Sequence, residues 1–189
     1  MEHPVQEISS VIKGLTQGSP AEQKHVLETY FTTDAAFQHP FCHVPSFSNV
    51  SVPLVGVVDS RWVIWMIYRW YKILSPRIAL KVHAAVLDQR QQILYVQISQ
   101  VFSLWFVPFY KSHVQLVSAL HLSRTSDDSK YYIHKQEDLY QVNEFVKFVW
   151  PYGDIVLTIW QCFMALLCVV GALLLAPLTW AGEMIAQKK

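Results

Sequence analysis

The chain has 189 residues, of which 52% are hydrophobic, 14% aromatic and 15% charged, and its formal net charge is +1. This balance excludes a strongly basic surface, so we expect no nucleic-acid partner. The length suits one domain over residues 1–150 and a short tail over residues 151–189.

The chemistry-bearing motifs of common enzymes are missing. The three cysteines are Cys42, Cys162 and Cys168, and the last two lie inside the most apolar segment of the chain. Their number and spacing fit neither a disulfide framework nor a metal site, so we expect no metal. The sequence also has no phosphate-binding glycine loop and no dinucleotide fingerprint, so we expect no cofactor.

Two helices and a short strand are predicted at the N-terminus. Apolar residues at positions 5, 8, 11, 12 and 15 form a helical stripe over residues 5–16. The sequence Ser-Pro-Ala-Glu at residues 19–22 is a capping box, and the helix that it starts should run to about Phe31. Alternation over residues 34–39 then predicts a strand that stops at Pro40.

A loop and an aromatic helix are predicted next. Residues 41–59 contain Pro45 and Pro53 and are expected to form a loop draped over the domain. Ser60 should cap a helix over residues 61–74, which holds five aromatic residues. A helix of this composition is either buried or lies partly in an interface.

Four strands and a last helix are predicted in the second half of the domain. In the first strand, alternate apolar residues should lie on one face of the sheet. Glu137 and Asp138 are interpreted as the cap and first-turn acid of the last helix, in preference to a catalytic role. The four strands cover residues 78–87, 92–102, 112–124 and 130–136, and the helix covers residues 139–149. The apolar face of the first strand holds Ile78, Leu80, Val82, Ala84 and Val86.

The connection between the second and third strands is apolar where polar residues are usual. Trp105, Phe106, Phe109 and Tyr110 lie at this hairpin tip, where they would be costly as a bare solvent patch. They suit insertion into a membrane interface, so membrane lipids are an expected partner. The alternative is that these aromatic residues fill the domain or cover the sheet.

The C-terminal tail contains a candidate transmembrane helix. Residues 155–182 carry no charged side chain, and residues 155–176 would form a helix of roughly 33 Å, enough to cross a bilayer core of about 30 Å. Pro177 should kink or end this helix. We expect a single-pass C-terminal anchor, by default in the endoplasmic reticulum with the domain facing the cytosol; a buried core helix and a helical hairpin are the alternatives.

The order of these elements is that of the nuclear-transport-factor-2-like superfamily. YFTTDAAFQHPF at residues 30–41 resembles the SnoaL-like polyketide cyclases, and QEDLYQVNEFVKFVWPYG at residues 136–153 resembles the fungal SigF-like branch. The resemblance implies an α+β fold, also called cystatin-like, in which a cone-shaped curved antiparallel sheet wraps around N-terminal helices. The transmembrane helix would be added to this domain.

The resemblance also implies a cavity into which a few polar side chains project. His39 is the candidate general base and Tyr30 or Tyr68 the candidate hydrogen-bond donor, while Gln97 and His121 are polar residues within apolar strands. These five residues are the candidate ligand-binding set, and whether they catalyse anything stays open. In the alternative interpretation, the histidines are satisfied core or edge residues and the tyrosines only pack.

Three functions are consistent with this sequence. The first is a membrane-anchored domain that binds a hydrophobic small molecule or lipid, such as a sterol or acyl lipid. The second is an isomerase, cyclase or dehydratase of a hydrophobic polyketide or terpenoid intermediate. The third is a protein-interaction scaffold, including a homodimer formed through the open face of the sheet.

Overall fold

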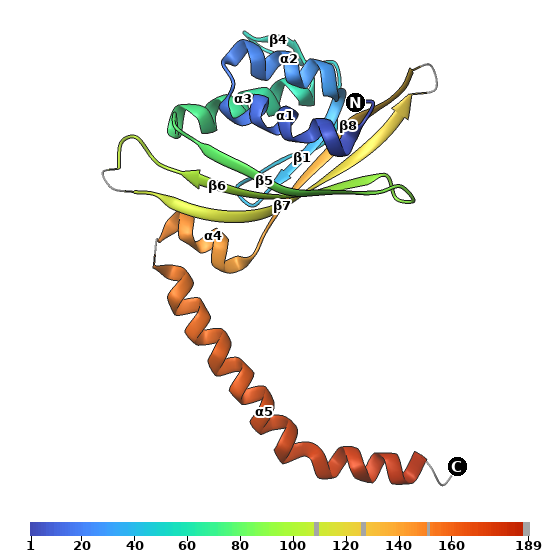
Figure 1. The fold of residues 1–189 in the computed structure, drawn as a ribbon, viewed down its shortest axis with the longest axis vertical. Helices are drawn as coiled ribbons and strands as arrows, with labels where there is room; N and C mark the ends of the chain where they lie inside the picture. Colours follow the sequence, from blue (N-terminus) through green and yellow to red (C-terminus); the bar gives the residue numbers. More distant parts are fainter. Residues whose placement is uncertain (108–109, 126–127, 151, 187–189) are drawn as a thin grey trace. The chain divides into compact units, whose positions relative to one another are not determined.

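Three helices lie on one face of a curved six-stranded sheet (Figure 1). The computed structural model describes residues 1–107, 110–125, 128–150 and 152–186, and the chain divides into two units, Met1–Pro151 and Tyr152–Lys189. The three helices are α1 (Pro4–Gln17), α2 (Pro20–Tyr30) and α3 (Ser60–Leu74). Their apolar sides and the inner face of the sheet enclose the core, which includes Ile8, Leu27, Phe37 and Ile133.

The sheet has the order β2-β1-β8-β7-β6-β5. It is mixed, because β1 runs parallel to β8 while the other neighbouring pairs are antiparallel. The expected all-antiparallel sheet is therefore corrected: alternation indicates a strand but does not specify its partner or direction. The strands are β1 (Phe31–His39), β2 (Cys42–Val44), β5 (Ala79–Asp88), β6 (Ile93–Phe102), β7 (Ser112–Thr125) and β8 (Asp128–Tyr140).

The helix starts show which local signals the fold uses. In α2 the capping box is formed by two reciprocal hydrogen bonds. The Ser19 hydroxyl accepts a hydrogen bond from the Glu22 amide at 3.3 Å, and the Glu22 carboxylate accepts one from the Ser19 amide at 2.6 Å. In α3 the cap is Asp59, whose carboxylate accepts from the Trp62 amide at 2.8 Å. The expected cap, Ser60, is instead the first residue of the helix and is buried.

The segment expected to be a simple loop contains β2 and a separate hairpin of β3 (Val50–Val52) and β4 (Gly56–Val58). The hairpin lies largely exposed, with positive φ angles of 69° at Leu54 in its turn and 99° at Gly56, the first residue of β4. Two proline residues near these short strands concealed them, because proline usually interrupts strand patterns.

A β-bulge changes the face of β5. The register between β5 and β6 shifts between Val82 and Ala84. Leu80 and Val82 pack against the core before the bulge, whereas Ala85 and Leu87 do so after it. Val86 is 64% exposed, so the expected single apolar face is wrong beyond Val82.

The strand β8 is longer at its C-terminal end than the sequence pattern indicates. It pairs with β7 on one side and β1 on the other and continues to Tyr140, so α4 covers only Val142–Val149. Glu137 and Asp138 therefore lie within a central strand and neither cap nor begin a helix. Backbone partners in β1 and β7 as far as Glu137, and in β7 alone from Asp138 to Tyr140, are the physical reason that the strand continues through these acidic residues.

The second unit contains α5 (Gly153–Ala186), a single helix of 34 residues. The helix continues through Pro177, so a stop there is wrong and a helical hairpin is excluded. Figure 1 shows that α5 bends in its last third, which agrees with the other expectation for Pro177, a kink. Gly153–Ala172 has a mean hydropathy of 2.3 and 0% of it is buried. The structure thus contradicts a buried core helix and shows a helix long and apolar enough to cross a membrane.

Candidate functional site

The first unit contains a cavity of 380 Å³ between the helices and the inner face of the sheet. Most of its wall is apolar, because α1 and alternate residues of the strands turn hydrophobic side chains inward. Representative wall residues are Ile8, Val11 and Leu15 from α1 and Ile98, Leu116 and Leu120 from the sheet.

A cluster of polar side chains interrupts this apolar wall at Asp138. The period of two along β8 places Gln136 and Asp138 on the inner face, and β7 supplies Ser118 opposite Asp138. The Ser118 hydroxyl donates to Asp138 Oδ1 at 2.7 Å, and Gln136 Nε2 donates to the same oxygen at 3.0 Å. None of the described residues donates a hydrogen bond to the second oxygen, Oδ2.

Burial controls the ionisation of Asp138. The residue keeps some surface exposed to the cavity, but its carboxyl group lies deep inside the domain. Burial raises the pKa of this carboxyl, and the hydrogen bonds from Gln136 and Ser118 oppose the shift only in part. Asp138 therefore holds its proton to a higher pH than an exposed aspartate does.

The helix α3 contributes a hydrogen-bond donor to the same cluster. The hydroxyl of Tyr68 donates to Gln136 Oε1 at 3.0 Å, which orients the amide so that its Nε2 faces Asp138. Burial, reinforced by the nearby Asp138 charge, raises the pKa of Tyr68, so its hydroxyl stays protonated. A continuous chain of hydrogen bonds thus runs from Tyr68 through Gln136 to Asp138.

His39 forms a second group of contacts at the end of β1. Its Nδ1 accepts from the Phe41 amide at 3.3 Å, which assigns the proton of the neutral ring to Nε2, and Nε2 lies 3.3 Å from the Tyr140 hydroxyl. The Tyr71 hydroxyl lies 3.3 Å from Nδ1. Burial lowers the pKa of His39 to about 4, so the ring is neutral at pH 7.

Tyr140 connects this second group to the strand that carries Asp138. Its hydroxyl accepts from Gln100 Nε2 at 3.2 Å, and its pKa is raised by burial and by the Asp138 charge. The two groups therefore line the same side of the cavity, on β1, β8 and the neighbouring α3. Among the described residues that line the cavity, none is lysine or arginine.

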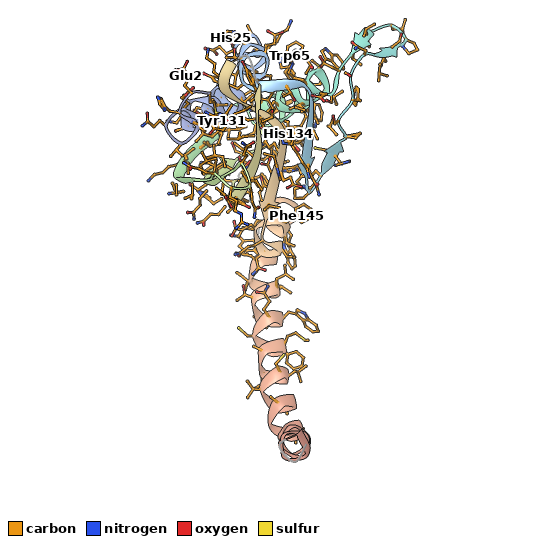
Figure 2. The ribbon with its side chains drawn as sticks, turned by 90° about the vertical axis from the view of Figure 1, so that its right-hand side faces the viewer. Glu2, His25, Trp65, Tyr131, His134 and Phe145 are labelled. Carbon is orange, nitrogen blue, oxygen red and sulfur yellow. The ribbon has the colours of Figure 1, made fainter. Side chains whose placement is uncertain are left out.

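Aromatic side chains line the exposed part of the cavity. Phe41 and Trp70 are 52% and 56% exposed, while Tyr110 is partly buried. Phe145, labelled in Figure 2, lies on α4 with its ring centroid 4.9 Å from that of Phe41. The Tyr110 hydroxyl donates to the Lys147 carbonyl at 3.4 Å, so α4 lies beside this rim.

The structure brings two of the five candidate ligand-binding residues, His39 and Tyr68, to the cavity. Tyr30 ends α2, is partly buried and is not among the residues that line the cavity. Gln97 lies exposed on the outer face of β6, because Val96 and Ile98 point inward on either side of it.

His121 lies on the outer face of β7, with Nε2 2.9 Å from the Glu137 carboxylate. Its neighbours Leu120 and Leu122 are buried, so strand alternation turns the imidazole outward. The expected placement of Gln97 and His121 in the cavity is therefore wrong: polarity within an apolar strand does not reveal which face a residue occupies.

The expected membrane-contact residues divide into two kinds. Trp105 and Phe106 are 69% and 54% exposed at the turn after β6, as an interfacial role requires. Tyr110 instead lines the cavity, and burial raises its pKa. Phe109 lies outside the described residues.

Several cavity residues were missed by the sequence analysis. Gln136, Asp138 and Tyr140 alternate along β8, and this spacing would have identified them had the strand been extended to residue 140. Gln100 and Tyr71 carried no comparable signal. Within the described residues, no group of three or more histidine, cysteine, aspartate or glutamate side chains is arranged to hold a metal ion.

Comparison with known proteins gives one match that covers nearly the whole chain. The family model of the SigF NTF2-like domain matches residues 1–180, a region that includes most of α5. No curated protein sequence matches significantly.

Comparison with solved structures gives matches of low sequence identity. An NTF2-like protein of unknown function from an Exiguobacterium species is 7% identical, with a TM-score of 0.48 over 71% of this chain and 98% of that one. ActVI-ORFA from Streptomyces coelicolor is 15% identical, with a TM-score of 0.43 over 72% and 96%. The epoxide hydrolase/cyclase-like enzyme SalBIII, described in pyran ring formation in salinomycin, is 10% identical, with a TM-score of 0.47 over 74% and 91%.

Proposed function

Because the chain belongs to the SigF NTF2-like domain family and encloses an apolar cavity, we propose that it binds a hydrophobic small molecule or lipid at a membrane. The observation that carries this proposal is the cavity of 380 Å³, which falls within the range of about 300–1,000 Å³ typical of small-molecule sites. Its walls are mainly apolar, and most of their polar side chains gather around Asp138 and His39. Such a site gains affinity from buried apolar surface, at roughly 25 cal/mol per Å², and orientation from the few polar groups.

The helix α5 supports the membrane part of the proposal. Its first 20 residues have a mean hydropathy of 2.3, and such a helix would leave a large apolar surface in water. Spanning a bilayer removes that surface from water and satisfies every backbone group within the helix. Since only residues 150–152 separate α4 from α5, an embedded α5 keeps the cavity-containing unit at the membrane surface.

The exposed aromatic residues near the rim support exchange with lipid. The Trp105 amide donates to the Leu74 carbonyl at 3.3 Å, which holds the turn with Trp105 and Phe106 against the end of α3. Trp70 and Leu74 on that part of α3 line the cavity. Tryptophan and phenylalanine side chains at this rim suit the headgroup level of a bilayer, from which an apolar ligand enters directly.

Two measurements test this function. Membranes from cells that express the full-length protein are washed with alkaline carbonate, and the protein should stay in the pellet. Lipids extracted from the detergent-purified protein should contain, by mass spectrometry, a species enriched over the same detergent extract without the protein. Release into the supernatant would contradict the anchor, and repeated preparations without an enriched lipid would contradict the binding function.

A second candidate function is proton-transfer catalysis, and the environment of Asp138 favours it specifically. A buried carboxyl with a raised pKa beside the Tyr68 hydroxyl chain suits an isomerase, cyclase or dehydratase. His39, with a pKa of about 4, is a weak base at pH 7, so Asp138 replaces it as the proposed proton-transfer group.

The catalytic proposal is tested by comparing metabolites of cells that carry the wild type, Asp138→Asn or His39→Ala. Catalysis by Asp138 predicts that Asp138→Asn abolishes a product and that its precursor accumulates. His39→Ala should reduce the same product less severely. An unchanged metabolite profile, with the variant protein present at the wild-type level, would refute catalysis and leave the binding function intact.

A further inference from the structure

The polar cluster defines the kind of ligand that the cavity accepts. We propose that it selects an uncharged lipid bearing a hydroxyl group, with the hydroxyl directed at Asp138 Oδ2, and that it discriminates against lipids that end in a carboxylate or phosphate. This inference rests on the proposed binding function and specifies the ligand class for the same cavity.

The first argument is the open acceptor on Asp138. Both donors that reach this residue, the Ser118 hydroxyl and Gln136 Nε2, contact Oδ1. Oδ2 accepts no hydrogen bond from the described residues, and it is not among their fully enclosed polar atoms, so it faces the cavity that Asp138 lines. Leaving such an atom unsatisfied beneath an apolar ligand is unfavourable, and a hydroxyl donor on the ligand removes this penalty.

The second argument is that the neighbouring donors already have partners. The Tyr68 hydroxyl donates to Gln136, and the Gln136 amide donates to Asp138. The Ser118 hydroxyl also donates to Asp138. With Asp138 ionised, the group around it presents an acceptor to the cavity, which a ligand hydroxyl matches as a donor; a protonated Asp138 would donate to the same hydroxyl.

The third argument is charge. No lysine or arginine occurs among the described residues that line the cavity, and the His39 ring is neutral at pH 7. A carboxylate or phosphate would meet Asp138 without a compensating cation, and burying an unpaired charge is strongly unfavourable. A cationic amine would pair with Asp138 but would have to leave water for an otherwise apolar wall, where the desolvation penalty offsets the attraction.

The fourth argument is the gradient of exposure along the wall. Three polar residues of the Asp138 cluster are buried, with Ser118, Gln136 and Tyr68 at 1%, 6% and 8% exposure. The exposed residues of the wall are apolar, with Phe41 and Trp70 at 52% and 56%. A ligand that enters with its hydroxyl leading therefore places its hydrocarbon against the aromatic rim.

The test is a competition among three chain-matched probes. Full-length protein in detergent micelles is equilibrated at about pH 8 with equal amounts of 1-tetradecanol, tetradecanoic acid and tetradecylamine. Native mass spectrometry measures the occupancy of each probe, and extraction of the micelles corrects for its concentration there. We expect the alcohol to exceed both charged probes by about tenfold or more, because only the alcohol avoids burying a charge.

A conservative variant tests whether Asp138 is the group that the ligand meets. Asp138→Asn removes the negative charge at nearly constant volume, and the ratio of acid to alcohol should rise about tenfold. Asp34→Asn makes the same chemical change at an exposed position of β1 outside the cavity and should leave the ratio at the wild-type value.

The outcomes separate this inference from the function on which it rests. Equal occupancy by alcohol and acid, or a preference for the amine, would overturn the ligand class while leaving binding established. Binding of none of the probes, together with no co-purifying lipid, would refute the binding function itself. If Asp138→Asn does not fold, the wild-type competition alone still decides the ligand class.

Discussion

His39 shows how a single buried side chain makes stability depend on pH. Its ring packs among aromatic neighbours, with centroid separations of 5.6 Å to Tyr71 and 5.2 Å to Tyr140. Burial disfavours the charged ring and lowers its pKa to about 4, whereas in the unfolded chain a histidine titrates near its ordinary value. Between these two values the unfolded state binds more protons, so acidification favours unfolding.

The expected result is a loss of stability as the pH falls from about 6.5 to about 4. His39 alone accounts for up to roughly 3 kcal/mol of this loss, because burial lowers its pKa from the ordinary value to about 4. His39→Phe keeps an aromatic ring but cannot be protonated. The free energy of unfolding should therefore fall less steeply with decreasing pH over this interval. Urea denaturation at a series of pH values measures this pH dependence of the free energy of unfolding. An equal pH dependence for the variant and the wild type would show that His39 is accessible to protons in the folded state.

Tyr68 provides a second prediction at the residue scale, because its hydroxyl is the donor that satisfies Gln136 Oε1 at 3.0 Å. Tyr68→Phe leaves this buried oxygen without its donor and should lower the free energy of unfolding by about 1–3 kcal/mol. The matched control is Tyr95→Phe, at a position 39% exposed on the outer face of β6, which should change stability much less. Equal midpoints in urea for the two variants would contradict the role assigned to Tyr68.

At the scale of elements, α3 matters because it presents Tyr68 and Tyr71 to the cavity. Its N-terminus is fixed by Asp59, whereas the buried Ser60 hydroxyl has no hydrogen-bond partner among the described residues. Asp59→Ala should therefore destabilise the protein by about 1 kcal/mol, the usual effect of losing an N-cap. Ser60→Ala removes an unsatisfied polar group and should be neutral or slightly stabilising. A larger loss for Ser60→Ala than for Asp59→Ala in thermal unfolding would reverse the assignment.

The strands β5 and β8 show how small backbone changes determine the site. The bulge in β5 exchanges its inward and outward faces after Val82, which leaves Val86 exposed. In β8, the extension of the strand to Tyr140 adds inward-facing positions. This extension brings Asp138 and Tyr140 to the cavity. A shift of one residue in either strand would turn these side chains to the other face.

At the scale of the whole molecule, the proposed anchor is tested by placing charge within α5. Leu166 and Val170 are exposed, one turn apart, within its most apolar part. The double variant Leu166→Arg with Val170→Arg should weaken membrane insertion, since each arginine near the centre of a span costs about 2.5–3.5 kcal/mol. Carbonate extraction should then release a larger fraction of the protein. Leu166→Ala with Val170→Ala is the matched control, and equal retention of both double variants would refute a spanning α5.

Features that depend on a few neighbouring residues could be predicted from the amino-acid sequence. The capping box before α2, the strand-like segments at residues 92–102 and 112–124 and the charge-free C-terminal segment each depend on local chemistry, and each was found where the pattern indicated. The motifs at residues 30–41 and 136–153 likewise indicated the superfamily and its SigF-like branch, which the family match confirms. His39 was identified as a cavity residue because it ends a strand with a recognisable motif.

The set of side chains that share the cavity depends on how distant segments of the chain pair in the folded domain. The parallel pairing of β1 with β8 joins two strands that are far apart in the sequence. With β7 on its other side, β8 therefore has backbone partners on both sides as far as Glu137. No local pattern contains that information, because a strand continues or ends according to whether its amide and carbonyl groups find partners in other strands. Asp138, read from sequence as part of a helix start, therefore became the centre of the site, while Gln97 and His121 were turned to the outer face.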